Sequence, residues 1–465
     1  MKIKDILEVI NGKLISGNEN DELGNFSKDS RTVAKGDVYV AIKGENFDGN
    51  KFAEHAIKNG AKTCILSKLS NEIKEYDHIN IIEVADTLLA LQQIATYKRS
   101  MYNIPVVAVT GSVGKTSTKD IIASVMSTKY KVLKTQGNMN NEIGLPMTIL
   151  NLKDEEALVV EMGMNHFGEI RLLTKIAKPT LAVITNIGTA HIGNLGSREN
   201  ILKAKLEILE GLQGDTVVIN NDNDLLNKWA KENASINANL SQNYIFQNQE
   251  LNKGKYNIIT YGIENESNYM AENIESYEDK SVFNIGKYRI IVPVGGQHFV
   301  LNALCAVAVG KYFDIPMNKI IKGIADLELT QKRMQIENTK VGAIIINDTY
   351  NANYDSMKAA IKYLEGVENR RKIAVLGDML ELGEYSQKLH EDVGSEIKNI
   401  DILITVGEQS KNIARNAKAK EIFSFENNQQ AIEKIKEIIS KEDAILLKAS
   451  NSMKFNEIVE ELKKF

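Results

Sequence analysis

The chain has few cysteines, few prolines and no long apolar run. Its 465 residues include two cysteines, five prolines and one tryptophan. Cys64 and Cys305 lie far apart and have no Cys or His at metal-ligand spacing, which favours two buried thiols over a disulfide or a metal site. No apolar run approaches the length that crosses a membrane. The sequence therefore gives no sign of a disulfide-stapled domain or of a membrane protein.

An excess of charge of one sign is also missing. The chain has 57 basic and 61 acidic residues, for a net charge of −4. This balance does not indicate a nucleic-acid surface or a polybasic membrane patch. At the N-terminus, Asp5, Glu8 and Asn11 interrupt the apolar positions, so the pattern predicts an amphipathic helix rather than a signal peptide. We therefore expect a cytoplasmic protein.

The length and composition indicate several globular domains. A chain of 465 residues with 43% hydrophobic and 25% charged residues exceeds one ordinary hydrophobic core, so two or three domains are expected. No Gly/Ser linker separates them, and the boundaries follow from motif placement. We predict an α/β fold in three domains, at residues 1–84, 85–313 and 314–465.

Short apolar strands alternate with helical patterns along most of the chain. This alternation predicts a small α/β unit, then a doubly wound, mostly parallel sheet, then a second parallel α/β domain. For residues 251–294 we expect an antiparallel edge added to the central sheet. The predicted strands are 37–42, 63–66, 158–160, 181–185, 216–219, 256–261, 281–285, 288–292, 343–347, 372–376, 402–406 and 444–447. The predicted helices are 52–58, 87–99, 302–312, 355–364, 390–397, 429–439 and 455–462.

The most informative segment present is residues 106–117, with the sequence VVAVTGSVGKTS. It joins a β-branched strand to a glycine loop and a helix start, which is the layout of a phosphate cradle. Backbone N–H groups would face the anion, Lys115 would add an ammonium group, and Thr116 would offer a hydroxyl to Mg²⁺. The usual P-loop pattern also has a glycine at the place of Val109, so this loop is a variant.

Polar side chains follow the next strands. Glu161 comes directly after an apolar strand, where open α/β sheets bind ligands, and is either a metal ligand or a solvated strand-end acid. His191 lies in a later loop and is either a second metal ligand or a solvated histidine. Lys205 lies on a predicted helix and, without further context, is an ordinary surface lysine.

In this setting the chain resembles the Mur ligases, the ATP-dependent amide-forming enzymes of peptidoglycan precursor synthesis, over essentially its whole length. TGSVGKT is the P-loop form of that family. The resemblance implies that Lys205 carries a carbamate formed with CO₂ and that two Mg²⁺ ions are bound. It also implies a UDP-sugar-binding first domain, a P-loop ATPase-like central domain and a Rossmann-like third domain that binds the incoming dipeptide.

Other segments resemble the type of Mur ligase that adds D-alanyl-D-alanine to UDP-MurNAc-tripeptide. These segments are 347–353 (NDTYNAN), 376–384 (LGDMLELGE), 29–32 (DSRT), 43–49 (KGENFDG) and 138–146 (NMNNEIGLP). The expected reaction proceeds through an acyl phosphate and gives UDP-MurNAc-pentapeptide, ADP and phosphate. The resemblance further implies roles in the cell wall, cell shape and cell division, and a monomeric protein.

The resemblance assigns site residues in four groups. The catalytic residues are Lys115, Glu161, His191 and carbamylated Lys205. The expected metal ligands are Thr116, Glu161, His191 and Lys205. The nucleotide would contact Gly111, Ser112, Val113, Gly114, Lys115, Thr116, Ser117, Asn302, Arg333 and Asp348. The other substrates would contact Ser30, Arg31, Lys43, Gly44, Phe47, Asp48, Gly49, Asn138, Asn140, Asn141, Glu142, Asn186, Tyr350, Asn351, Asn353 and Ser356.

One of these positions, Asn302, has a plainer reading, and several other positions depart from the family pattern. Asn302 would read the adenine edge, or it is a polar residue at a helix N-terminus. His390 is interpreted as a surface helix residue and is not assigned to the site. The departures are Asn50 in place of histidine, Tyr354 in place of proline, and Ala449 and Asn451 within a Lys-Gly-Ser-Arg pattern.

Two alternatives remain open from the sequence. A folate-polyglutamate or cyanophycin-type ligase would use the same chemistry but would not need the UDP-like N-terminal segment. A nucleotide-dependent switch would need only the phosphate loop, although the chain has no guanine-reading Asn-Lys-x-Asp element at a suitable place.

Overall fold

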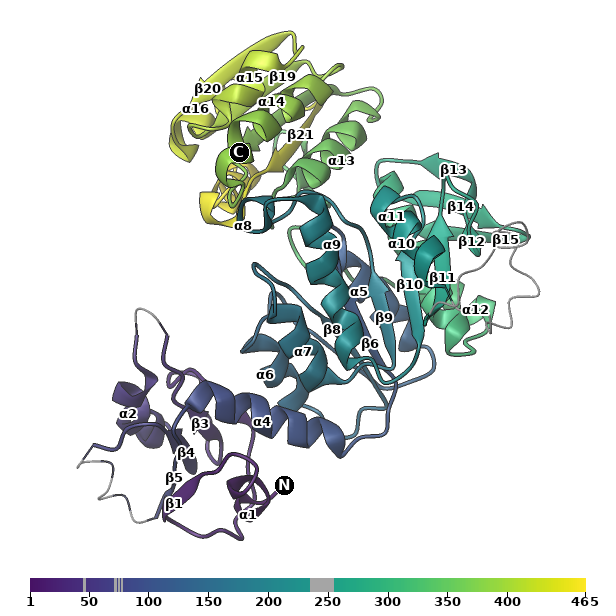
Figure 1. Cartoon of the computed structure of the whole chain (residues 1–465). Coiled ribbons are helices and arrows are strands. Elements are labelled where there is room, and N and C mark those ends of the chain that lie inside the picture. The colour runs from purple at the N-terminus through teal and green to yellow at the C-terminus, as the bar shows by residue number, and fades with distance from the viewer. Residues whose placement is uncertain (45–46, 71–72, 74–75, 77, 235–254) are drawn as a thin grey trace.

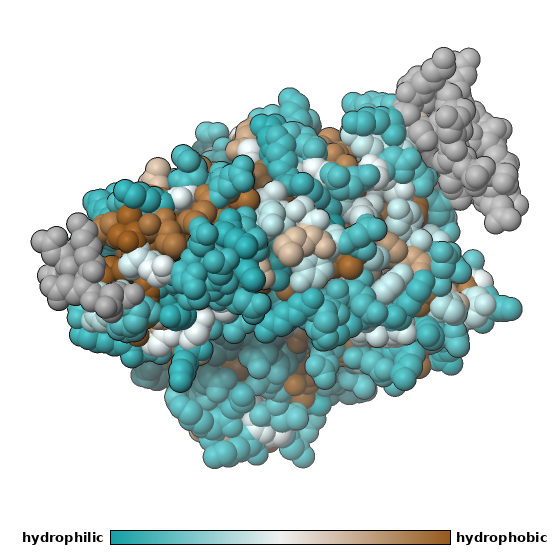
Figure 2. Space-filling model, turned by 90° about the horizontal axis from the view of Figure 1, so that it is seen from below, coloured by the Kyte–Doolittle hydropathy of each residue, from teal (hydrophilic) through white to brown (hydrophobic). Residues whose placement is uncertain are grey.

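The computed structural model describes residues 1–44, 47–70, 73, 76, 78–234 and 255–465. Three α/β units follow one another along the chain, from purple through teal to yellow (Figure 1). We call them the first, central and third units. No helix among the described residues is long and apolar enough to cross a membrane. The face seen in Figure 2 is mostly hydrophilic and is interrupted by smaller apolar areas.

Five short strands form the sheet of the first unit, in the order β1-β5-β4-β3-β2. Only the β1–β5 pair among these neighbours is antiparallel. The predicted N-terminal amphipathic helix is confirmed as α1, which buries Ile3 and Ile6. The elements are α1 (Ile3–Leu7), β1 (Lys13–Ser16), β2 (Phe26–Ser27), β3 (Val38–Val40), η1 (Gly49–Phe52), α2 (Ala53–Lys58), β4 (Thr63–Leu66) and β5 (Asn80–Glu83).

The helix α4 (Thr87–Ser100) leads into the central unit. The main sheet of the central unit has seven described strands in the order β12-β11-β10-β9-β6-β8-β7, and every neighbouring pair is parallel. The strands are β6 (Val106–Thr110), β7 (Val132–Lys134), β8 (Ala157–Glu161), β9 (Leu181–Ile184), β10 (Thr216–Asn220), β11 (Asn257–Gly262) and β12 (Tyr269–Met270). The helices are α5 (Lys115–Met126), α6 (Gly144–Leu150), α7 (Glu169–Ala177), α8 (Ile192–Leu195), α9 (Arg198–Leu206), η2 (Glu207–Gly211), α10 (Asp224–Asn233), α11 (Gln297–Tyr312) and α12 (Met317–Ala325).

The antiparallel edge predicted for residues 251–294 is wrong. β11 and β12 extend the central sheet in parallel, and β13 (Glu272–Ser276), β14 (Ser281–Ile285) and β15 (Tyr288–Val292) form a separate antiparallel sheet. Residues 251–254 lie outside the described part of the chain. Strand patterns predict where a strand is, but its partner and direction depend on distant segments, which explains the error.

The third unit has six strands in the order β16-β17-β21-β18-β19-β20, and β16 alone among them runs antiparallel to its neighbour. The strands are β16 (Gln335–Asn338), β17 (Ile344–Asn347), β18 (Arg371–Gly377), β19 (Ile402–Val406), β20 (Glu421–Phe425) and β21 (Asp443–Lys448). The helices are α13 (Tyr354–Glu365), η4 (Gly383–Tyr385), α14 (Ser386–Glu396), α15 (Lys411–Asn416), α16 (Asn428–Ile438), η5 (Asn451–Met453) and α17 (Asn456–Lys463).

The central strands of both large sheets are buried on both faces. All residues of β6, β8 and β21 are buried, which is typical of parallel sheets covered by helices on each side. Cys64 and Cys305 are free and buried, so the prediction of two buried thiols is confirmed. The α/β fold class is confirmed, whereas the boundaries at 84 and 313 remain predictions.

Candidate active site

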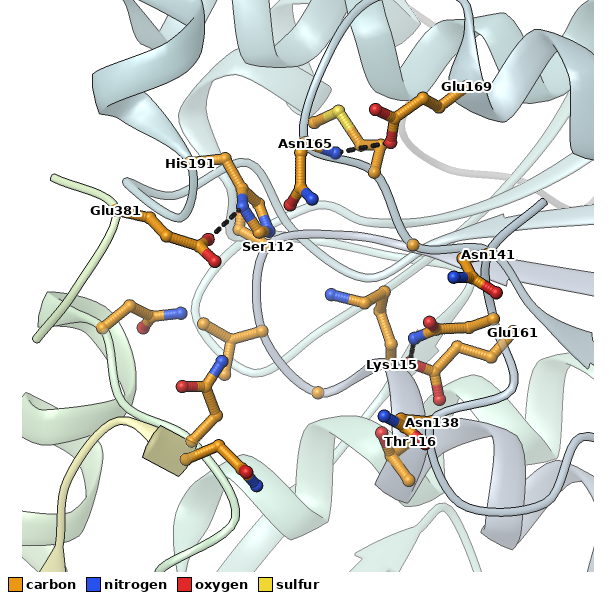
Figure 3. A pocket seen from close by; sticks show the side chains of 18 of the residues that line it. Ser112, Lys115, Thr116, Asn138, Asn141, Glu161, Asn165, Glu169, His191 and Glu381 are labelled. Atoms are coloured by element: carbon orange, nitrogen blue, oxygen red, sulfur yellow. Dashed lines mark hydrogen bonds and ion pairs between the residues drawn. The ribbon is translucent and has the colours of Figure 1, made fainter. Parts of the chain in front are cut away.

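The predicted phosphate cradle forms a loop between β6 and α5 (Figure 3). Gly111 and Gly114 have φ angles of +148° and +82°, values that L side chains rarely adopt. A Cβ at Gly111 would lie 2.0 Å from Oγ1 of Thr185. Both glycines are therefore needed for the shape of this loop, and the predicted strand–loop–helix arrangement is confirmed.

The segment after β9 holds the loop in place. Oδ1 of Asn186 accepts a hydrogen bond from the Val113 N–H at 2.8 Å, and the Asn186 carbonyl accepts one from the Ser112 N–H at 3.1 Å. The Ser112 hydroxyl accepts from the Gly188 N–H at 3.0 Å. Asn186, predicted to bind substrate, thus has its side-chain oxygen engaged in shaping the loop.

Two cationic side chains lie at the start of α5. Nζ of Lys115 donates to the Gly111 carbonyl at 2.8 Å, and burial lowers the pKa of Lys115. Nη2 of Arg333 donates to Oγ1 of Thr116 at 3.1 Å. The Arg333 guanidinium also stacks 3.9 Å from the ring centre of Tyr350. Arg333 therefore already reaches the phosphate loop from the segment that enters the third unit.

Glu161 is the last residue of β8, at the carboxyl end of the sheet, as predicted. Its backbone N–H donates to Oγ1 of Thr135 at 3.0 Å, and its Oε1 accepts from Nδ2 of Asn140 at 2.7 Å. Oε2 is buried and has no hydrogen-bond partner among the described residues. A buried carboxylate oxygen without a partner is costly, so this atom is free to take a cation.

Lys205 is fully buried on α9. Its Nζ has no hydrogen-bond partner within the described part of the chain. Burial, helped by the nearby Lys115 ammonium, places the pKa of Lys205 well below its usual value, although Glu161 opposes the shift. The reading of Lys205 as an ordinary surface lysine is wrong, because helix α9 turns this residue inward. The structure instead presents a buried amine that favours the neutral form.

His191 lies at the start of α8 with a φ of +64°. Its side chain is 17% exposed, and its Nδ1 lies 2.8 Å from Oε2 of Glu381 (Figure 3). Burial lowers the pKa of His191, and the contact with Glu381 opposes that shift. The reading of a solvated loop histidine is therefore wrong. Its partner Glu381 comes from the third unit.

Many of these side chains line one pocket between the central and third units, whereas Gly111, Ser117, Asn186 and Lys205 do not line it. Its volume is about 690 Å³. It brings together the following predicted residues: Ser112, Val113, Gly114, Lys115, Thr116, Asn138, Asn140, Asn141, Glu142, Glu161, His191, Arg333, Tyr350, Asn351, Asn353 and Ser356. Predicted residues from two sheets thus meet at one place.

Other pocket residues were not predicted as site residues. They include Asn165, Phe167, Glu169, Glu381 and Asn451. The first three follow β8 closely, so the rule that ligands bind beyond strand carboxyl ends could have found them. Glu381 and Asn451 are distant in sequence from the phosphate loop, and only the tertiary structure places them here.

The predicted residues of the first unit lie outside this pocket. Arg31 is paired with Asp29 through Nη2 at 2.6 Å, and Phe47 is 53% exposed. The departure at Asn50 has a structural explanation, because its Oδ1 accepts the Ser67 N–H at 2.9 Å. The predicted UDP-sugar contacts, Ser30, Arg31, Lys43, Gly44, Phe47, Asp48 and Gly49, remain predictions.

Asn302 and Asp348 lie beside the pocket without lining it. Asn302 is the sixth residue of α11, which starts at Gln297, so the reading of a helix N-terminal residue is wrong. Its Oδ1 accepts from the Thr118 hydroxyl at 3.1 Å, which places it under the phosphate loop. Asp348 is held by Nζ of Lys448 at 2.5 Å. Their predicted contacts with adenine and ribose remain predictions.

The residues of the third unit that depart from the family pattern are Tyr354, Ala449 and Asn451, and the structure shows how each is placed. The Tyr354 hydroxyl donates to Glu396 at 3.1 Å, and Ala449 is fully buried. Nδ2 of Asn451 donates to the Tyr350 carbonyl at 3.0 Å. Asn451 thus supports the residue whose ring stacks on Arg333.

His390 is not a surface residue, so that interpretation is wrong. It is fully buried on α14, its Nε2 accepts from the Met379 N–H at 2.9 Å, and its Nδ1 lies 2.7 Å from the Ser386 carbonyl. The leucine and valine positions of α14 turn this face of the helix toward the core. His390 therefore holds the start of the loop that carries Glu381.

We expect His390 to make the protein less stable in acid. Burial lowers the pKa of His390 in the folded chain, so below the ordinary pKa of about 6.5 the unfolded chain binds the proton more readily. The free energy of unfolding should fall as the pH decreases from 7 to 5. His390→Gln keeps an acceptor for Met379 and should show a shallower fall in denaturant titrations. Exposed His166→Gln serves as control, and equal slopes in wild type and His390→Gln would contradict the assignment.

Comparison with known proteins accounts for this combination of loop, pocket and sheets. Three domain models of one family match the chain: "Mur ligase family, catalytic domain" at 25–99, "Mur ligase middle domain" at 109–248 and 236–310, and "Mur ligase, glutamate ligase domain" at 332–451. The chain belongs to the Mur ligase family. The predicted family resemblance is therefore confirmed.

Similar proteins extend over the full length of this Mur ligase. A Bacillus subtilis protein named UDP-N-acetylmuramoyl-tripeptide–D-alanyl-D-alanine ligase is 37% identical over 471 aligned positions, covering 99% of this chain and 98% of its own. The crystal structure of MurF from Acinetobacter baumannii has a TM-score of 0.86 at 29% identity, covering 99% and 98% of the two chains. MurF from Thermotoga maritima in complex with ADP has a TM-score of 0.79 at 29% identity, covering 94% and 97%.

Proposed function

We propose that this Mur ligase joins D-alanyl-D-alanine to UDP-MurNAc-tripeptide at the expense of ATP. The products are UDP-MurNAc-pentapeptide, ADP and phosphate, formed through an acyl phosphate. The observation that carries the proposal is the pocket in which the phosphate loop meets Glu161, His191 and the third unit, in a chain with a full-length relative of that name. The reaction named for this relative also argues against the two alternatives, a folate-polyglutamate or cyanophycin-type ligase and a nucleotide-dependent switch.

The reaction brings two anions together, the peptide carboxylate and the γ-phosphate. Lys115 and Arg333 line the pocket at the phosphate loop and would share the charge that develops on the transferred phosphate. Lys115 is the first residue of α5, and its Nζ lies at the phosphate loop. It can therefore exchange its hydrogen bond to the Gly111 carbonyl for one to a phosphate oxygen. These cations lower the repulsion that opposes acyl phosphate formation.

The unpaired Oε2 of Glu161 and the unpaired Nζ of Lys205 support a proposed site for two Mg²⁺ ions. Thr116 and Glu161 would hold one ion, and His191 and modified Lys205 would hold the other. Among the described residues, no three His, Cys, Asp or Glu side chains group closely enough to hold a metal ion, so the proposed ligand sets include a hydroxyl and a modified lysine. When bound, Mg²⁺ supplies positive charge to the phosphates and the reacting carboxylate.

Lys205 has the properties that carbamate formation needs. A neutral amine nitrogen bonds to the carbon of CO₂ and loses one proton to water, which converts a neutral side chain into an anionic carbamate. The lowered pKa and the unpaired Nζ of Lys205 favour this step. The carbamate oxygens would then have Mg²⁺ as the partner that the protein itself does not supply.

The other residues would position the substrates. We assign the first domain, 1–84, to the UDP sugar, the central domain, 85–313, to ATP, and the third, 314–465, to the dipeptide. Tyr350, Asn351, Asn353 and Ser356 line the pocket on the third-unit side and are placed to contact the incoming dipeptide. Closure of the third unit would keep water from the acyl phosphate. The cytoplasmic location and monomeric state remain predictions.

The reaction can be tested by phosphate release. We expect release from ATP only when UDP-MurNAc-tripeptide, D-alanyl-D-alanine and Mg²⁺ are all present, with formation of one pentapeptide per phosphate. Three reactions serve as controls. Two of them omit either UDP-MurNAc-tripeptide or D-alanyl-D-alanine, and the third contains L-glutamate in place of the dipeptide. The proposal would be refuted by phosphate release that does not depend on UDP-MurNAc-tripeptide and D-alanyl-D-alanine. It would also be refuted by release that requires a single amino acid instead of the dipeptide.

A further inference from the structure

A charge cluster joins α5 to β7, one helical turn beyond the phosphate loop. The side chain of Asp120 is fully buried, and its Oδ1 lies 3.0 Å from Nζ of Lys119 and 2.8 Å from Nζ of Lys134. Lys119 is itself fully buried and donates to the Thr135 carbonyl at 2.8 Å. None of these charged groups lines the pocket, so the chemistry proposed above leaves the cluster unexplained.

The second oxygen of Asp120 holds the segment between α12 and β16. Both the backbone N–H and the hydroxyl of Thr330 donate to Oδ2 of Asp120, at 3.0 Å and 2.7 Å. Two bonds from one residue to one carboxylate oxygen fix the position and the direction of the chain at that point. This segment leads from the central unit into the third unit (Figure 1).

Three residues later the same segment contacts α5 again. Arg333 donates to Oγ1 of Thr116, and residues four apart, such as Thr116 and Asp120, share one helix face. Residues 330–333 therefore run along a single face of α5 toward the phosphate loop. Lys332 and Met334, on either side of Arg333, have φ angles of +65° and +49°. Such left-handed conformations cost energy and persist where neighbouring contacts impose them.

The electrostatics favour an ionised carboxylate in the cluster. Burial by itself would raise the pKa of Asp120, but the ammonium groups of Lys119 and Lys134 and the Thr330 hydroxyl outweigh burial and lower it. Hydrogen bonds to a charged acceptor are stronger than those between neutral groups. Thr330 is therefore held by two partly buried hydrogen bonds to a charged, buried acceptor.

We propose that Asp120 is a positioning residue that clamps Thr330 so that Arg333 lies over the phosphate loop. The clamp keeps residues 330–333 against the central unit, and the third unit pivots beyond residue 334. Arg333 then stays at the nucleotide while the third unit moves. The nucleotide part of this inference rests on the proposed function, because it takes Arg333 as a contact of the ATP phosphates.

Hydrogen exchange of the free protein tests the clamp without any substrate. In Asp120→Asn and in Thr330→Val, backbone amides of residues 328–334 should exchange at least about 10-fold faster than in wild type. Ser124→Ala is the matched control, because its hydroxyl makes a similar bond from the same helix to the Gly323 carbonyl at 2.6 Å. Unchanged exchange in Thr330→Val, or an equal change in Ser124→Ala, would overturn the clamp.

Measurements of nucleotide binding test whether the clamp positions Arg333 for ATP. Thr330→Val should raise the Kd and KM for ATP about 10-fold and leave the KM values of the other two substrates unchanged, and Thr330→Ser should restore wild-type values. Arg333→Ala combined with Thr330→Val should bind ATP no more weakly than Arg333→Ala alone, since both act through one contact. Additive losses, or equal changes in all three KM values, would overturn the positioning role. Wild-type protein that fails to bind ATP would instead refute the proposed function and leave the exchange result standing.

Discussion

Replacing Lys205 with alanine is expected to lower kcat of the ligase reaction roughly 10³-fold. The variant lacks the amine that would carry the carbamate, so one proposed metal position would keep His191 and lose its anionic ligand. The buried, unpaired Nζ of Lys205 makes no hydrogen bond that alanine would lose, so the loss should appear in catalysis more than in folding. Rates of pentapeptide formation at saturating substrates measure the effect.

Two controls separate this role from a general effect of substitution. Lys203→Ala, at an exposed position of the same helix α9, should retain wild-type kcat. Short carboxylic acids added to Lys205→Ala should restore part of the activity, because a free carboxylate can occupy the place of the carbamate. Full activity of Lys205→Ala would contradict the assignment of Lys205, and failure of every carboxylate to rescue would count against the carbamate.

Glu161→Gln is expected to lower the apparent affinity for Mg²⁺ about 10²-fold and to reduce kcat at ordinary Mg²⁺ concentrations. Glutamine has the same shape and can still accept the hydrogen bond from Asn140. It lacks the negative charge that the unpaired Oε2 offers to a cation. Rates measured over a wide range of Mg²⁺ concentration report this change directly.

The matched control for Glu161 lies just before the same strand. Glu156 precedes β8, is exposed and accepts the Lys131 N–H at 2.9 Å. Glu156→Gln should leave the dependence on Mg²⁺ unchanged. If Glu161→Gln had wild-type affinity for Mg²⁺ and a reduced kcat, the carboxylate would act on substrate rather than on metal.

Periodicity located most strands well. The strands at 281–285, 288–292 and 402–406 have the predicted bounds, because each is rich in β-branched and aromatic residues. The addition of strands to the central sheet was predicted, but the parallel direction of 257–270 and the separate sheet of 272–292 were not, because pairing joins residues distant in the chain. The helix α11 starts five residues before its predicted start of 302, because Gln297 and His298 obscure the apolar pattern.

The candidate site divides in the same way. Glycines, Lys115 and Glu161 were recognisable because a loop between strand and helix, and a strand end, are local features. His390 was misread because a histidine on an amphipathic helix can face either way, and only packing shows that it is buried. Glu381 was part of a recognised segment, but its contact with His191 depends on how the third unit docks.

The sequence by itself determined the alternation of strands and helices, the phosphate loop and the family, since these depend on residue types at short spacings. Only the tertiary structure decided the burial of Lys205, the contact of Glu381 with His191 and the contact of Arg333 with Thr116. That last pair is separated by 217 positions. Such contacts depend on how whole sheets pack against one another, and no local pattern of side chains encodes that packing.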